Sequence, residues 1–260
     1  MRRAALAIPA VLIALFVAAP MFIVVPMSFS TAISFEFPPP GYSLHYYARF
    51  FSDRSWTVPA VNSLIIATGT SIVTMLIVTP AAFVMVRQRF IGKTAVNVLM
   101  LLPMMVPAIV MSLAYYSYFG ELKLLQTFPG VIIAHSCMAT PVAFLIVQAS
   151  LKGFDRNLER AAMNLGAGPL RSFARVTFPV LRPGFLVAAL FAFIQSFDEA
   201  VVAIFISGRD TITLPRKMFE SIRMDADPVI AVVSTLIFSA ILGGTMVGFA
   251  LRRRPQSRPA

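Results

Sequence analysis

The chain has 260 residues, of which 58% are hydrophobic and only 13% are charged, and its mean hydropathy is +0.81. This composition excludes a soluble globular domain of this length, so we expect a membrane protein. The net charge of +11 would indicate a nucleic-acid partner if the basic residues formed a soluble face. They lie instead in short tracts beside apolar runs, so we expect no nucleic-acid partner and interpret them as topology signals.

Six apolar runs are each near or above the ~20 residues that a helix needs to cross a bilayer. They cover residues 4–27, 58–86, 95–119, 131–151, 185–207 and 229–251. An even number of spans places both termini on the same side of the membrane. The sequence therefore predicts an all-α integral membrane protein with six transmembrane helices, forming a single domain over residues 1–260.

The first run has some features of a secretory signal peptide. It follows Arg2 and Arg3, and it has Ala18 and Ala19 near its end. Its 24 residues are many for the apolar region of a signal peptide, and it completes the even number of spans. We therefore favour a retained first span.

The segment after the first run, residues 28–57, is rich in proline and aromatic side chains. Such rings suit the membrane–water interface, so an interfacial belt is the first interpretation. A docking surface for an outer partner is the second.

Lysine and arginine are unequally divided between the two sides of the membrane. Fifteen of the 22 lie on the side of the termini, of the loop after the second run and of residues 152–183. The other side holds the remaining seven. Because short cytoplasmic loops carry the excess of Lys and Arg, we assign both termini and residues 152–183 to the cytoplasm.

Several residues inside the runs perturb a regular apolar helix. The prolines are Pro80, Pro103, Pro107 and Pro141. Their ordinary consequence is a kink whose freed carbonyls are satisfied by neighbours, and the alternative is a broken helix that lines a pathway. His135 in the fourth run has two interpretations as well: we favour a hydrogen-bonded core histidine over a proton relay.

Residues 158–183, which we call the hinge, form a basic, helix-patterned interruption between the fourth and fifth runs. Apolar and mostly small side chains recur there at helical spacing, which predicts one apolar stripe on a short helix. The stripe comprises Leu158, Ala161, Ala162 and Leu165. Asp155 can cap the start of this helix, and Gly166 can end it because glycine tolerates a left-handed backbone. Pro169 suits the first turn of a second helix, so the hinge predicts helix, turn, helix.

Asp198 and Glu199 interrupt the fifth run. A carboxylate within a span costs about 2.5–3.5 kcal/mol on insertion scales, so it usually faces protein or a watery cavity. One interpretation is a buried ion pair or hydrogen bonds to other helices, and the one that we favour is the lining of a solute pathway. Neighbours on a helix point about 100° apart, so we favour Asp198 over Glu199. An acidic pathway would suit a cationic solute.

No motif for nucleotide hydrolysis is complete. Gly92, Lys93 and Thr94 match the end of a P-loop, but Arg87 stands where the earlier glycine is required. HExxH and GxSxG are also absent from the sequence. We therefore expect no catalytic, metal or cofactor site, and any ATP must be hydrolysed by another chain.

One pattern in the hinge carries a family resemblance. It consists of Ala161, Ala162, Leu165, Gly166, Ala167, Val176, Phe178 and Pro179. With these residues the hinge resembles the EAA loop of inner-membrane permease subunits of binding-protein-dependent ABC importers. The family has Glu directly before the two alanines, where this chain has Arg160, with Glu159 one place earlier. Over nearly the whole chain the sequence is similar to the spermidine/putrescine type, including LKGFD, SFDEAVVAIFISG and TLPRKMFESIR.

The resemblance implies a type I ABC importer permease fold in a bacterial inner (plasma) membrane. It also implies a second permease subunit, two cytoplasmic ATPase subunits and a periplasmic or extracellular solute-binding protein. Residues 152–183 would be the cytoplasmic coupling loop, seated in a groove of the ATPase. The ATPase-coupling residues would be Glu159, Ala161, Ala162, Leu165, Gly166, Ala167 and Pro179, and the substrate-pathway residues would be Asp198 and Glu199.

The leading hypothesis is therefore a permease subunit that forms half of a solute pathway, for a polyamine or another small cationic solute. A first alternative is a non-transporting membrane scaffold or receptor whose basic hinge binds a cytoplasmic partner or anionic membrane lipid. A second alternative is an ion-coupled secondary carrier, which needs no ATPase.

Overall fold

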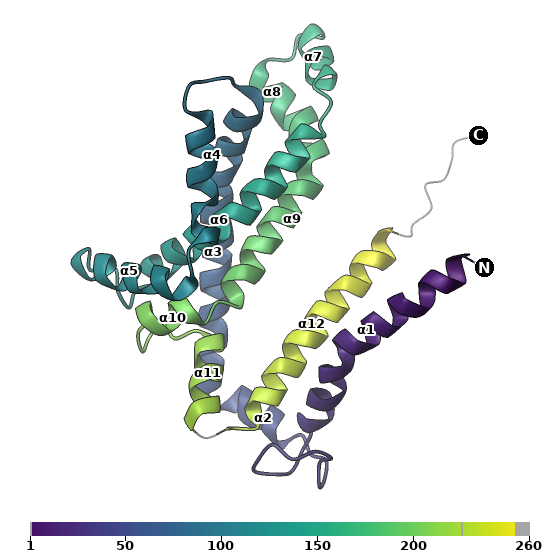
Figure 1. Ribbon diagram of the computed structural model, residues 1–260, viewed down its shortest axis with the longest axis vertical. Coiled ribbons are helices and arrows are strands. Elements are labelled where there is room, and N and C mark those ends of the chain that lie inside the picture. Colours follow the sequence, from purple (N-terminus) through teal and green to yellow (C-terminus); the bar gives the residue numbers. More distant parts are fainter. Residues whose placement is uncertain (1, 225, 253–260) are drawn as a thin grey trace. The chain divides into compact units, whose positions relative to one another are not determined.

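The computed structural model describes residues 2–224 and 226–252, and the regular elements in these residues are all helical (Figure 1). This confirms the prediction of an all-α protein. The chain divides into two compact units. One comprises the described parts of residues 1–57 and 218–260, and the other comprises residues 58–217.

The first unit contains α1 (Arg2–Met27), α2 (His45–Ser52) and α12 (Val229–Arg252), and α12 contacts both of the other helices. An ion pair between Arg49 Nη2 and Asp227 Oδ2, 3.0 Å apart, joins α2 to the segment before α12. The Tyr46 hydroxyl donates a hydrogen bond of 2.6 Å to the Ala32 carbonyl, which holds the loop between α1 and α2 against α2.

The second unit contains most of α3 (Arg54–Arg87) and runs into α11 (Leu214–Met224). Between them lie α4 (Lys93–Leu101), η1 (Leu102–Met105), α5 (Ala108–Glu121), α6 (Phe128–Lys152), α7 (Asn157–Asn164), α8 (Pro169–Ser172), η2 (Phe173–Thr177), α9 (Phe178–Phe197) and α10 (Val201–Ile206). Among the described helices, α6 and α9 pack against each other most extensively, and α7 and α8 lie at one end of that pair (Figure 1).

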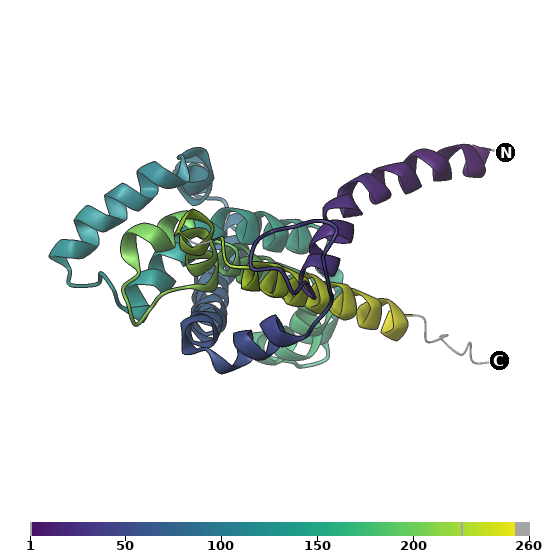
Figure 2. The ribbon, with the colours of Figure 1, turned by 90° about the horizontal axis from the view of Figure 1, so that it is seen from below.

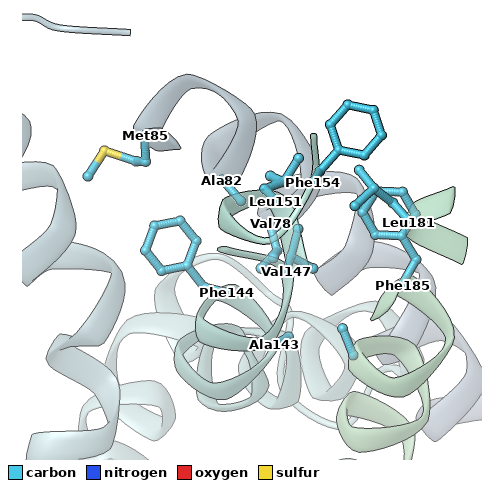
Figure 3. Close-up of a cluster of buried hydrophobic side chains, with 11 residues drawn as sticks. Val78, Ala82, Met85, Ala143, Phe144, Val147, Leu151, Phe154, Leu181 and Phe185 are labelled. Carbon is cyan, nitrogen blue, oxygen red and sulfur yellow. The ribbon is translucent and has the colours of Figure 1, made fainter. Parts of the chain in front are cut away.

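A buried apolar cluster joins three helices of the second unit (Figure 3). Small side chains at the contacts let the helices approach closely, as in other membrane proteins. The cluster comprises Val78, Ala82 and Met85 of α3, Ala143, Phe144, Val147 and Leu151 of α6, Leu181, Phe185 and Ala188 of α9, and Phe154. This core holds the hinge end of the unit together.

Among the described residues, four helical segments are long and apolar enough to cross a membrane unbroken: Arg54–Arg87, Phe128–Lys152, Pro169–Phe197 and Val229–Met246. They correspond to the second, fourth, fifth and sixth predicted spans. The third predicted span corresponds to the bent pair Lys93–Met105 and Ala108–Glu121. The first predicted span falls in α1, where the apolar stretch found among the described residues, Leu15–Met27, is shorter than a span, so this span stays a prediction.

For the third run, residues 95–119, the favoured interpretation of a simple kink at its prolines is wrong, and the helix is broken, as in the alternative interpretation. The two halves are bent by 102°, and Figures 1 and 2 show α5 turned sharply away from α4. The break falls at Val106, whose backbone is extended because it precedes Pro107. By contrast, α3 continues through Pro80 and α6 continues through Pro141.

The predicted bounds of the fifth span, residues 185–207, are also wrong. The helical segment begins at Pro169, inside the hinge, and ends at Phe197. It includes the five-residue π-turn Phe173–Thr177, in which the Phe178 N–H reaches back to the Phe173 carbonyl. This wider turn ends two residues before Pro179, which has no N–H to donate. The second part of the hinge, from Pro169 on, and the fifth span are therefore one continuous helical segment.

Candidate functional site

The hinge begins as its sequence predicts. Asp155 Oδ1 accepts a hydrogen bond of 2.9 Å from the Asn157 backbone N–H, and α7 starts there. Pro169 is the first residue of α8, where its missing N–H removes no helical bond. Helix, turn, helix is thus confirmed.

The end of α7 depends on Gly166, whose φ of +86° lies in the left-handed region. The Gly166 N–H donates to the Met163 carbonyl at 2.9 Å, and the Ala167 N–H donates to the Ala162 carbonyl at 3.1 Å. These two bonds form a Schellman motif, which satisfies carbonyls that the last turn of a helix leaves free. A side chain at Gly166 would meet no atom within 4 Å, so only the backbone conformation restricts this position.

The short helix α7 is amphipathic with its acidic face inward. The structure describes every residue of α7, and Glu159 is the only one of them that is buried. The predicted apolar stripe faces outward instead: Leu158 is 45% exposed and Leu165 is 89% exposed. Leu170 in α8 is 82% exposed and lies just beyond the turn. The hinge therefore presents apolar side chains that its own chain does not cover.

Glu159 is held from two other elements. Its Oε1 lies 2.7 Å from Arg87 Nη2 at the end of α3, and it accepts a hydrogen bond from the Thr177 hydroxyl of η2. Burial alone would raise the pKa of Glu159. The hydrogen bonds from Arg87 and Thr177 and the positive charges of Arg87 and Arg156 outweigh burial, so the pKa of Glu159 is lowered.

The Arg87 guanidinium is itself fixed by an aromatic contact. It lies 4.6 Å from the centroid of the Phe83 ring, at cation–π distance. Phe83 in turn makes an edge contact with Phe173 of η2, with ring centroids 5.7 Å apart. Arg87, Glu159 and Thr177 thus form an anchor that ties the hinge to the end of α3.

The sequence identified Glu159 but missed its two partners. Arg87 served only as a topology signal, and Thr177 had no signal of its own. Arg160, which occupies the position of the family's Glu, is exposed, whereas Glu159 points inward. Of the other predicted coupling residues, Ala161, Leu165, Gly166 and Pro179 are exposed, and Ala162 and Ala167 are half-buried.

The two predicted pathway carboxylates lie at a helix break, not within a continuous helix. Asp198 follows the last residue of α9 and is exposed. Glu199 is half-buried, and its Oε1 accepts a hydrogen bond of 3.0 Å from the Val202 N–H at the start of α10. We assumed that a continuous helix sets the directions of the Asp198 and Glu199 side chains. This assumption is wrong, because α9 ends at Phe197.

A buried polar group lies directly before this break. Nδ1 of His135 in α6 lies 2.8 Å from the Ser196 hydroxyl of α9. Ser196 donates in turn to the Thr70 hydroxyl of α3 at 3.1 Å. His135 is only 1% exposed, which agrees with a hydrogen-bonded core histidine. These three residues join three spans close to Asp198.

Comparisons with known proteins agree with this architecture. Residues 79–254 match the model of the family described as "Binding-protein-dependent transport system inner membrane component". The putrescine transport system permease protein PotI of Escherichia coli (strain K12) is 30% identical over 251 residues, which cover 94% of this chain and 89% of PotI. The spermidine/putrescine transport system permease protein PotC of Haemophilus influenzae is 26% identical, over 82% of this chain and 83% of PotC.

A solved structure shares the fold. It is the crystal structure of a bacterial ABC transporter involved in the import of the acidic polysaccharide alginate. The TM-score is 0.69 at 17% sequence identity, with 97% of this chain and 96% of the other chain covered. The resemblance to spermidine/putrescine-type permeases and the type I importer permease fold are thereby confirmed. The chain belongs to the family of binding-protein-dependent transport system inner membrane components, the multi-pass permease subunits of ABC importers.

Proposed function

We propose that this permease forms half of a solute pathway and couples, through its hinge, to a cytoplasmic ATPase subunit. The working complex would contain a second permease subunit, two ATPase subunits and an outer solute-binding protein. Both termini and residues 152–183 would lie in the cytoplasm. The observation that carries the proposal is the orientation of α7, with Glu159 anchored inward and Leu165 exposed.

The outward stripe supports docking on a protein partner. A leucine that passes from water into an interface contributes about 1.5–3 kcal/mol, so Leu165 and Leu170 together could supply a large part of a docking energy. The inward anchor would keep the stripe in place, because Glu159 is bonded to both α3 and η2. A movement of the ATPase would then reach the spans through the hinge.

The continuous segment Pro169–Phe197 supports the transmission of that movement. Its 29 residues join the hinge directly to Asp198. At 1.5 Å per residue the segment is about 44 Å long, which is enough to connect one face of the membrane with the pathway. Closure of the ATPase pair would shift this segment as a rigid body and switch the access to the solute.

We propose a polyamine or another small cation as the solute. The relatives PotI and PotC carry the names of putrescine and spermidine/putrescine transport systems. Asp198 is the stronger candidate for contact with an ammonium group, because it is exposed, whereas an oxygen of Glu199 already accepts the Val202 N–H.

The test is uptake by the complete transporter in proteoliposomes, supplied with its own solute-binding protein. Labelled putrescine and spermidine would be compared with an amino acid of similar size, with and without ATP inside. We expect uptake of a polyamine that requires ATP and continues when the proton gradient is collapsed. Uptake that survives ATP depletion and stops with the proton gradient would contradict the proposal and favour a secondary carrier.

A further inference from the structure

A cavity of about 420 Å³ lies at the hinge end of the second unit, between α3, α4 and α6. Its lining includes Lys93, Thr94 and Asn97 of α4, Gln148 and Lys152 of α6, and Met85 of α3. Met85 is two residues before the anchor residue Arg87, and Lys152 is the last residue of α6 before the hinge. The cavity is therefore at the ends of spanning helices, where we expect the lipid headgroups.

The cavity is positively charged. It contains two lysines, and none of its described lining residues is acidic. The Lys93 ammonium donates one hydrogen bond, of 3.0 Å, to the Gln88 carbonyl, which leaves two further donors. In addition, α4 begins here after Gly92, without a side-chain cap, so the free N–H groups of its first turn add positive potential.

Neutral donors complete the lining. Gln148 is only 8% exposed, and its Nε2 lies 3.4 Å from Asn97 Oδ1. This bond turns the Asn97 carbonyl oxygen toward Gln148 and leaves the Asn97 amide N–H groups to donate to a ligand. The Thr94 hydroxyl can donate too. Two ammonium groups with an amide and a hydroxyl match the oxygens of a phosphate.

We propose that this cavity binds the phosphate of an anionic phospholipid from the leaflet on the hinge side. Basic pockets between spanning helices suit such headgroups, and the side chains of Met85 and Val86 provide an apolar wall for the adjoining part of the lipid. Free inorganic phosphate offers the same oxygens but has no apolar part. Binding of this phospholipid would depend neither on the identity of the solute nor on the ATPase partner of the proposed function.

The experiment uses the assembled transporter, purified in detergent and stripped of lipid. Native mass spectrometry would measure the binding of phosphatidylglycerol, of phosphatidylcholine with the same acyl chains, and of inorganic phosphate. The test variant is Lys93→Gln with Lys152→Gln. The matched control is Arg89→Gln with Arg160→Gln, which removes the same charge from exposed side chains outside the cavity. Lys93→Arg with Lys152→Arg keeps the charge and shows whether the cavity still folds.

We expect the strongest phosphatidylglycerol site to weaken about ten- to thirtyfold in the glutamine pair at the cavity, since each lysine near the surface contributes about 1 kcal/mol. The arginine pair should retain binding, and the control pair should change it less than about twofold. Equal binding of phosphatidylcholine, equal loss in the control pair, or displacement of the lipid by inorganic phosphate at equal concentration would each overturn the proposal.

Discussion

Glu159 Oε1 and Arg87 Nη2 lie 2.7 Å apart, and this ion pair joins the hinge helix to the end of a membrane-spanning helix. The two side chains are 12% and 22% exposed, so water screens the pair only in part. The Thr177 hydroxyl donates to the same carboxylate oxygen. The contact therefore fixes α7 and η2 to the end of α3, and it explains why an acidic residue faces inward on a helix whose apolar stripe faces outward.

Glu159→Gln should loosen the hinge. The glutamine can still accept from Thr177, but it leaves the Arg87 charge without its partner, which costs 3–5 kcal/mol for a fully buried pair and about 1–3 kcal/mol at this exposure. Hydrogen exchange of residues 157–177 in the assembled transporter would measure the change as faster exchange. Arg160→Gln is the control, because Arg160 is exposed, and it should exchange like the unmodified protein. Equal exchange in all three proteins would show that the pair does not hold the hinge.

The same pair predicts a pH dependence of hinge stability. The pKa of Glu159 is lowered from 4.5 in the folded protein. The ion pair therefore contributes its full stabilisation of the hinge above pH 4.5, and this stabilisation is lost as the pH falls through the lower pKa of the folded state. Intrinsic exchange rates change with pH, so exchange would be expressed as protection factors. These should stay constant from about pH 8 to pH 6 and fall only in acid, at pH values below 4.5. Glu159→Gln should abolish this acid-dependent fall, and an identical fall in that variant would assign the effect to other groups.

Gly166→Ala should destabilise the end of α7, because a residue with a Cβ pays about 1–2 kcal/mol in the left-handed region. Gly168→Ala is a matched control two residues away: Gly168 has φ −65°, and a side chain there also meets no atom within 4 Å. We expect reduced ATP-driven uptake and faster exchange in the first variant only. If both variants behave alike, the Schellman motif is not important for the hinge.

The two carboxylates at the end of α9 should differ in function. Asp198→Asn removes an exposed charge and should weaken polyamine uptake, with a higher KM, by about tenfold. In Glu199→Gln the side-chain oxygen can still accept the Val202 N–H, so the turn into α10 should persist and the KM should change less. Uptake of labelled putrescine at matched expression gives both values. An unchanged KM in Asp198→Asn would leave Asp198 outside the solute path.

Much of the fold could be predicted from apolar runs. The fourth run, residues 131–151, lies within α6 (Phe128–Lys152), because about 20 apolar residues admit few structures other than a spanning helix. The bend at Val106 could not be predicted in the same way. Proline inside a span is compatible with a continuous helix, as at Pro80 and Pro141, so the presence of a proline does not distinguish a kink from a break.

The candidate site was predictable only in part. The stripe of α7 and the turn at Gly166 follow from local spacing, and Glu159 follows from the family pattern. Arg87 lies 72 residues earlier in the sequence, and nothing local connects it with Glu159. Local spacing also could not predict whether the apolar stripe faces inward or outward. Spacing defines a face of a helix, but it does not define which groups that face contacts. Packing of η2 and the end of α3 determines that Glu159 points inward.

Docking of the hinge on the ATPase is tested most directly by substituting the two most exposed leucines of the hinge, Leu165 and Leu170. Leu165→Asn with Leu170→Asn would be purified with the second permease and the ATPase subunits, and the retained ATPase and ATP-driven uptake would be measured. Ile91→Asn is the control, since Ile91 is a fully exposed apolar residue in the loop between α3 and α4. The loss of about 3 kcal/mol of apolar burial should weaken ATPase binding about a hundredfold in the hinge variant and leave the control unchanged. Full retention of the ATPase with normal uptake in the hinge variant would contradict the account.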